Sequence, residues 1–344
     1  MANQNKQYQG TSLILFAVLI ITTLLCICYG AVHISIGEIF SALQKWFTAP
    51  NGMTLNERVF IEIRLPRALL SVLVGACLAT GGVLMQGLFR NPIVEPGLVG
   101  TSSGAAFGAA LYFVLGSIFK FNAGEWTLPF AACAGALFST LLVFTFSRSK
   151  ETGKSSIVTL LLTGIAINAL FMSGVGFLSY IARDPQARSI TFWGLGTLSG
   201  ANWHSVLIIG TSTIMCFIIA LRYAKHLNAL MIGEEEAQLL GLNISRIKFN
   251  VLLINVIMVA VATAFVGVIS FVGLIVPHLL RIINGSDNRF LLRNGFLLGG
   301  ILLGVADLIA RMALAPAELP IGIVTSAVGV PVFIILLRRK NYSF

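Results

Sequence analysis

Long runs of apolar residues recur along the chain and are separated by short polar segments. A helix needs about 20 apolar residues to cross the hydrocarbon core of a bilayer. Eight runs are long enough to predict membrane-spanning helices, at residues 11–32, 66–88, 97–118, 126–146, 155–181, 203–221, 294–314 and 319–337. The pattern therefore predicts an all-helical protein that crosses the membrane many times.

A ninth run, residues 249–280, contains no charged residue. As a single helix it would be about 48 Å long, which exceeds the thickness of a bilayer. We predict that it turns back at one of three small residues, Gly267, Ser270 or Gly273. One span then ends near Ile269 and a second, short span includes Pro277, which brings the total to about ten spans.

Composition supports a membrane protein and excludes several other classes. The chain of 344 residues is 57% hydrophobic and 10% charged, whereas soluble proteins have roughly 25% charged residues. A soluble fold would lack polar surface, and a nucleic-acid partner is disfavoured. The five cysteines lie inside apolar runs without metal or redox spacing, and the histidines are scattered, so no metal site is predicted; these residues are Cys26, Cys28, Cys77, Cys133, Cys216, His33, His204, His226 and His278.

The positions of the charged residues along the chain are more informative than the net charge of +10. With ten spans both termini lie on one side, and fifteen of the 23 Lys and Arg residues then share that side. Since such residues concentrate in cytoplasmic loops, we expect both termini in the cytoplasm. Eight cations remain on the outer side: Lys45, Arg58, Arg64, Arg67, Lys120, Arg183, Arg188 and Arg311.

The sequence offers little for catalysis. A phosphate-binding loop needs G-x4-G-K-[ST], and the residues Gly153, Lys154 and Ser155 imitate only its end, because Arg148 occupies the first glycine position. We therefore expect no ATP hydrolysis by this chain, and no enzyme activity. Asp307 is the only acid well inside a predicted span, where carboxylates are often functional. Alternatively, it forms an ion pair with Arg311, four residues on along the same helix face.

Residues 222–248 form the longest polar connection on the inner side. Within them Gly233-Glu234-Glu235-Glu236-Ala237-Gln238-Leu239-Leu240-Gly241 predicts a short amphipathic helix, which would suit docking into a groove of a soluble partner; a solvated acidic loop is the alternative. No connection is long enough for a separate soluble domain, so residues 1–344 are predicted to form one transmembrane domain.

Small residues recur at helical spacing in two predicted spans. They are Gly100, Gly104 and Gly108 in one span and Gly295, Gly299, Gly300 and Gly304 in another. Such faces let helix backbones approach closely. We favour packing within one subunit over a dedicated dimer contact.

Several motifs closely resemble the FecCD-type permeases of bacterial ABC importers, which take up iron siderophores, haem or cobalamin. The resemblance runs from about Arg64 to Arg339. The motifs are Arg64-Leu65-Pro66-Arg67, Gly82-x2-Met85-Gln86-x-Leu88-Phe89-Arg90-Asn91-Pro92-x2-Glu95-Pro96-Gly97, Gly233-Glu234-x2-Ala237-x2-Leu240-Gly241, Gly267-x-Ile269-x-Phe271-Val272-Gly273, and Ala306-Asp307-x3-Arg311 followed by Glu318-Leu319-Pro320.

The resemblance implies a type II ABC importer permease fold in the bacterial inner membrane. Such a permease pairs with a second copy of itself, binds two cytoplasmic ATPase subunits that hold the ATP, and receives substrate from a periplasmic binding protein. It implies no cofactor in the chain itself. It assigns ATPase coupling to Gly233, Glu234, Ala237, Leu240 and Gly241, and docking of the binding protein to Arg64, Arg67 and Arg311.

Substrate and pathway follow less directly. Residues 191–203 and 316–320 look most like those of haem-importing members, with cobalamin or a ferric siderophore as alternatives. Flexible methionines suit a weakly binding channel, so Met85 is a candidate pathway residue, with packing in the core or against lipid as the alternative. A proton- or sodium-driven secondary carrier is the rival class, but it predicts inverted repeats and paired intramembrane acids.

Overall fold

Every regular element in the described residues of the computed structural model is helical; these residues are 2–30, 34–118, 124–147 and 157–338. Within them, seven helices are long and apolar enough to cross a membrane: α1 (Ala2–Cys28), α4 (Leu65–Phe89), α6 (Thr127–Phe146), α7 (Ile157–Ile181), α9 (Trp203–Ile232), α11 (Ile244–Val266) and α13 (Asn288–Met312). Three shorter helices are also apolar: α5 (Thr101–Ile118), α12 (Val272–Asn284) and α14 (Ile321–Arg338). Together they correspond to the ten predicted segments.

The predicted boundary of the sixth span is wrong. The polar residues from Arg222 onward were expected in a connection, but α9 continues through them to Ile232. Residues 222–248 therefore comprise the last turns of α9, the short helix α10 (Glu234–Leu239) and the first turn of α11. Polarity marks where a helix leaves the hydrocarbon, whereas the helix itself ends at a glycine, Gly233.

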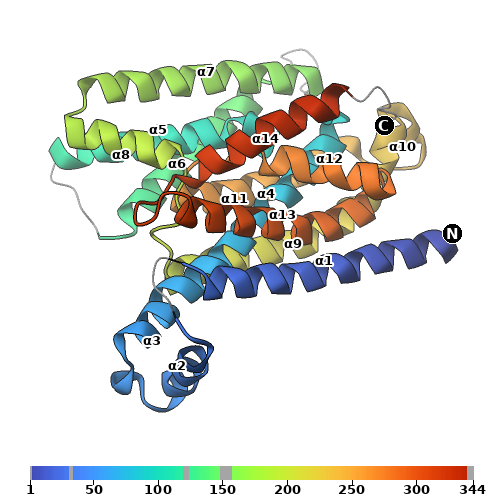
Figure 1. The fold of residues 1–344 in the computed structure, drawn as a ribbon. Coiled ribbons are helices and arrows are strands. Elements are labelled where there is room, and N and C mark those ends of the chain that lie inside the picture. The colour runs from blue at the N-terminus through green and yellow to red at the C-terminus, as the bar shows by residue number, and fades with distance from the viewer. Residues whose placement is uncertain (1, 31–33, 119–123, 148–156, 339–344) are drawn as a thin grey trace.

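Helix α4 forms the centre of the bundle (Figure 1). All its residues from Val74 to Phe89 are buried, and α9, α11, α12 and α13 pack around it. Glycines permit the closest approach to α13: a Cβ on Gly75 would lie 2.2 Å from the carbonyl oxygen of Gly299. In the same way Gly104 and Gly108 of α5 face the backbone of α6. The prediction that the small-residue faces serve packing within the subunit is confirmed for these helices.

The long apolar run breaks where the glycines indicated. Helix α11 ends at Gly267, which has φ +74, and α12 begins after Phe271, which has φ +70. Two backbone hydrogen bonds link neighbouring segments to the loop before α9: Thr197 N–H donates to the Val266 carbonyl at 2.8 Å, and Gly322 N–H donates to the Leu195 carbonyl at 2.9 Å. The end of α11 and the start of α14 are thus tied to this loop.

The two ends of the bundle carry different small elements (Figure 1). At one end lie α10, the N-terminal part of α1 and the C-terminal part of α14. At the other end lie α2 (Ile36–Thr48), α3 (Leu55–Val59), the π-helical turn η2 (Phe60–Arg64) and α8 (Asp184–Gly194). We call these the α10 end and the arginine end, because Arg64 ends η2, Arg67 lies in the first turn of α4 and Arg311 lies in the last turn of α13.

Candidate functional site

The arginine end contains a buried cluster of charges around Asp307. The Asp307 carboxylate on α13 has no exposed surface. Its Oδ1 accepts hydrogen bonds from Arg67 Nε and Nη2 at 3.0 and 2.9 Å, and its Oδ2 lies 3.0 Å from Arg311 Nε in an ion pair. Two guanidinium groups from α4 and α13 therefore share one carboxylate, which joins the two helices.

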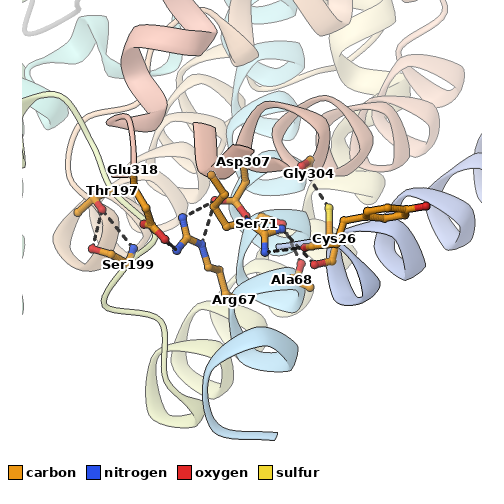
Figure 2. Close-up of polar contacts among 11 residues, drawn as sticks. Cys26, Arg67, Ala68, Ser71, Thr197, Ser199, Gly304, Asp307 and Glu318 are labelled. Carbon is orange, nitrogen blue, oxygen red and sulfur yellow. Dashed lines mark hydrogen bonds and ion pairs between the residues drawn. The ribbon is translucent and has the colours of Figure 1, made fainter. Parts of the chain in front are cut away.

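Arg67 is held from two sides (Figure 2). Opposite Asp307, its Nη1 donates to both carboxylate oxygens of Glu318 at 2.8 and 2.9 Å. Only 7% of Arg67 is exposed, whereas 42% of the Glu318 side chain is exposed. Glu318 thus connects the buried cluster to the surface, and it is the functional candidate that sequence reasoning missed, although the residue stood in a quoted motif.

Arg64 and Arg311 close the end of α1. Arg64 Nη1 donates to the Cys28 carbonyl at 3.1 Å, and Arg311 Nη2 donates to the Cys26 carbonyl at 3.1 Å. The last carbonyls of a helix lack partners within it and carry partial negative charge. These arginines satisfy that need while buried, so each has a structural reason to be positively charged.

The three predicted docking arginines are therefore brought together, but none lies open on the surface. Each is less than a tenth exposed, and all three contact groups of this same chain. Arg67 and Arg311 pair with the carboxylates of Asp307 and Glu318, and Arg64 donates to the last carbonyls of α1. These three arginines and two acids together carry one positive charge in excess. The cluster is therefore positively charged in its buried part, and its exposed part is the carboxylate of Glu318.

The predicted coupling segment is a compact helix at the opposite end. Helix α10 lies between Gly233 and Gly241, whose φ of +81 favours glycine. Glu234 contacts Lys248 on α11 at 2.7 Å and Arg90 at the end of α4 at 4.0 Å. Ala237 is fully buried against the bundle. These residues fix α10 in place.

The outward face at α10 includes Leu240, which belongs to the motif, and three residues that do not: Glu235, Glu236 and Leu239. Leu239 is 88% exposed, and Leu240, Glu235 and Glu236 are exposed as well. Leu239 and Leu240 are adjacent exposed apolar residues beside the acidic residues of the helix. Ala237 therefore positions the helix, and Leu239 and Leu240 form its apolar surface.

Met85 lies in the interior of the bundle. Its side chain has no exposed surface and belongs to the main hydrophobic cluster around α4. In this conformation it is a core residue, as the alternative interpretation stated, and it does not face a pathway.

Motifs far apart in sequence meet where α11 and α12 contact residues 86–96, at the end of α4 and just after it. Glu95 Oε1 accepts a hydrogen bond from the Phe271 N–H at 2.8 Å, and Asn255 Nδ2 donates to the Pro96 carbonyl at 3.0 Å. Arg281 on α12 donates to the amide oxygen of Gln86. The first bond fixes Phe271, the residue before α12, and the other two tie α11 and α12 to residues 86–96.

A cavity of about 300 Å³ lies beside this break, between α5, α7 and α8. Apolar side chains line most of it, and the polar lining residues are Glu95, Ser102, Ser103, Asn168, Trp193 and Ser270. Within the described residues, the buried Trp193 Nε1 has no hydrogen-bond partner. Trp193 belongs to the segment 191–203, so the residues that suggested a haem permease reach this cavity.

Metal and nucleotide chemistry find little support in the described ranges. No group of three His, Cys, Asp or Glu residues there could hold a metal ion. His33, one of the scattered histidines, and Gly153, Lys154 and Ser155, which imitate the end of a phosphate-binding loop, lie outside the described residues.

Comparisons with known proteins match nearly the whole chain. The FecCD transport family matches residues 18–339. The hemin transport system permease protein HmuU of Yersinia pestis is 42% identical over 86% of this chain and 87% of its own, and the cobalamin import system permease protein BtuC of Halobacterium salinarum is 39% identical over 90% and 82%. A solved metal-chelate type ABC transporter in an inward-facing conformation gives a TM-score of 0.83 at 32% identity, covering 96% of this chain and 99% of that one.

Proposed function

Because this chain belongs to the FecCD transport family of ABC importer permeases, we propose that it forms the pathway through which a bacterial importer moves haem across the inner membrane. The observation that carries the permease function is the bundle of apolar helices with a fixed α10 at one end, matched over 96% of the chain by a solved transporter. The 42% identity to a hemin permease supports haem as substrate. Cobalamin and ferric siderophores are the alternatives, since a cobalamin permease is 39% identical.

In this proposal the chain performs no covalent chemistry and holds no cofactor. Two cytoplasmic ATPase subunits bind and hydrolyse ATP, and their closure moves α10 in each of two permease copies. The motion changes which side of the central pathway is open, in a switch between two states. The α10 end is then cytoplasmic, as are both termini, which agrees with the excess of Lys and Arg residues expected on that side.

The ATPase would contact the exposed face of α10. Leu239 and Leu240 supply apolar area for a groove, while the contacts of Glu234 with Lys248 and Arg90 transmit displacement to α11 and α4. We expect Leu239→Glu to abolish co-purification of the ATPase with the permease. Gln238→Glu, an exposed change on the same helix, is the matched control and should leave co-purification intact; equal loss in both variants would contradict this contact.

The binding protein would dock at the arginine end. The excess positive charge there attracts an acidic partner and steers its approach, but Arg67 is already bonded to Glu318. An acidic side chain of the partner must therefore share Arg67 with Glu318. Glu318→Gln, which weakens the internal competitor, should tighten docking, and Arg67→Met should weaken it; a Glu318→Gln variant with weaker docking would contradict this role.

Transport itself decides the substrate. The chain is reconstituted in liposomes with its ATPase and binding protein, with ATP sealed on the side of the ATPase, and uptake of haem, cobalamin and a ferric siderophore is compared. We expect ATP-dependent accumulation of haem. Preference for one of the others would retain the importer and replace the substrate, whereas accumulation driven by a proton or sodium gradient without ATP would establish a secondary carrier.

A further inference from the structure

Helix α2 lies outside the bundle, although it is firmly attached to it. In the chain it lies between α1 and α4. Figure 1 shows α2 and α3 together at the arginine end, beside the bundle and beyond the C-terminal end of α1. Its sequence, IGEIFSALQKWFT, distributes three kinds of side chain over three faces of the helix. What each face contacts determines what remains for a partner.

The first face packs on the bundle. Ala42 is fully buried in a cluster with Phe60 and other apolar residues near the start of α4. On the same face Trp46 stacks on Trp203 at the start of α9, with ring centroids 5.2 Å apart and planes at 25°. Trp203 is itself held by a hydrogen bond from its Nε1 to the Ile61 carbonyl at 3.0 Å. The rotation of α2 about its axis is therefore fixed.

The second face is polar, and three of its side chains, Glu38, Ser41 and Lys45, contact α3. Lys45 Nζ donates to both oxygens of the Glu57 carboxylate at 2.9 and 3.0 Å, and Ser41 donates to the same group. Asn56 donates to Glu38 Oε1 at 2.7 Å, and this bond, with those from Ser35, lowers the pKa of Glu38 below its usual value. These polar groups face one another in the α2–α3 unit.

The third face is apolar and uncovered. Phe40, Leu43 and Phe47 are three, four and seven residues apart, so they form one stripe along the helix. Phe40 is 70% exposed and Phe47 is 81% exposed. Large aromatic side chains in this position would leave much apolar area in water, at roughly 25 cal/mol per Å².

Lipid is the occupant that the position of this stripe indicates. The spans α1 and α4 on either side of α2 in the chain place it at the level where helices leave the membrane. Helix α1, past which α2 projects, exposes nearly its whole apolar surface, including Leu24 and Leu25 in its last turns. Cys26 and Ile27 at the end of α1 belong to the same apolar cluster as Ala42 of α2, so the stripe lies close to the level at which α1 leaves the bilayer. It carries no charge, unlike the positively charged cluster at the arginine end.

We propose that α2 lies in the interface of the membrane leaflet at the arginine end, with Phe40, Leu43 and Phe47 inserted among the lipid acyl chains. Amphipathic helices of this kind bury their apolar face about 5–10 Å into the boundary between headgroups and acyl chains. Because α3 and η2 continue directly into α4, this anchor also sets the depth at which Arg64 and Arg67 sit below the membrane surface. The inference is independent of the transported substrate.

Spin labels on the full chain in lipid nanodiscs test this placement. Phe47→Cys and Phe40→Cys carry the label on the stripe, Thr48→Cys carries it on an exposed position of another face, and Ile14→Cys on the outer surface of α1 is the lipid-facing reference. Collision rates with oxygen, which concentrates in lipid, and with a water-soluble nickel chelate are measured, after subtraction of the label bound to the native cysteines.

We expect the ratio of oxygen to nickel collisions at positions 47 and 40 to exceed that at position 48 several-fold and to approach that at position 14. A ratio at 47 and 40 equal to that at 48 would place the stripe in water and overturn the proposal. Low collision rates with both reagents would show that protein, such as a second copy of the chain, covers the stripe, and would also overturn it.

Discussion

Asp307 is the buried carboxylate that compensates the positive charges of Arg67 and Arg311 at the arginine end. It is wholly buried and contacts both Arg67 and Arg311. Removing one partner of a buried ion pair leaves uncompensated charge and typically costs about 3–5 kcal/mol. We therefore expect Asp307→Asn to lower the thermal unfolding temperature strongly, measured on the permease in nanodiscs.

Glu318→Gln is the matched control for this change, because it removes a carboxylate from the same Arg67. Since the Glu318 side chain is 42% exposed, water screens the pair, and we expect a loss of about 0–1 kcal/mol. Equal destabilisation by both substitutions would show that burial does not determine the cost at this cluster.

Trp193 and Trp203 provide a second comparison between residues. Trp203 Nε1 donates to the Ile61 carbonyl, whereas the buried Trp193 Nε1 has no partner among the described residues. Trp203→Phe should cost about 1 kcal/mol for the lost hydrogen bond. Both substitutions also remove buried ring area, but Trp193→Phe has no hydrogen bond to lose among the described residues and should cost less than Trp203→Phe in the same thermal assay. A larger loss than for Trp203→Phe would contradict an unsatisfied donor at Trp193.

Helices in this bundle approach one another at positions that tolerate no side chain. A Cβ on Gly82 of α4 would lie 1.8 Å from the Gly273 carbonyl oxygen on α12, whereas a Cβ on Gly176 of α7 would meet nothing within 4 Å. We expect Gly82→Ala to separate the two helices and reduce the yield of folded protein severely. Gly176→Ala should stabilise α7 by up to about 1 kcal/mol from helix propensity alone. Size-exclusion profiles and unfolding temperatures distinguish the two, and equal behaviour would contradict the close contact.

The elements that the sequence predicts well are those whose pattern has one physical cause. Apolar runs mark spans because the bilayer requires them, and the break near Gly267 follows from the length limit of a span. The bounds of α9 were wrong because polarity reports the membrane surface and not the end of a helix. Helix α2 was missed because its apolar face is narrow and interrupted by polar residues that bond to α3, although Ser35-x2-Glu38 and Thr54-x2-Glu57 are both capping boxes.

The sequence predicts some residues of the candidate site but not the contacts between them. Motifs located Arg67, Asp307 and α10, and spacing paired Asp307 with Arg311 on one helix face. Neither motif nor spacing could show that Arg67 lies between Asp307 and Glu318, because that contact joins residues 240 and 251 positions apart. Likewise Ala237 and Leu239 are close in sequence but face opposite directions, which depends on how α10 rests on the bundle.

At the scale of the whole molecule, α4 connects the α10 end with the arginine end. Near its start Arg67 belongs to the charge cluster, and at its end Arg90 contacts Glu234 of α10 at 4.0 Å. Between them α4 is continuous and buried on all sides from Val74 to Phe89. A packed helix of this kind has little freedom to bend, because close-packed interiors transmit displacement. We therefore expect a shift of α10 to reach the arginine end through α4.

This connection predicts coupling between the two proposed docking events. If ATPase binding at α10 changes the affinity for the binding protein, the binding protein must change the affinity for the ATPase by the same factor. Arg90→Gln removes one contact between α10 and α4, and a partly exposed pair of this length contributes less than about 1 kcal/mol. We expect the coupling factor to fall by up to about 5-fold, measured as the Kd of the binding protein with and without the ATPase, while each Kd measured alone stays unchanged. Arg222→Gln removes an exposed cation at the same end and should leave the factor intact; an equal fall in both variants would show that net charge, and not the contact between Arg90 and Glu234, carries the coupling.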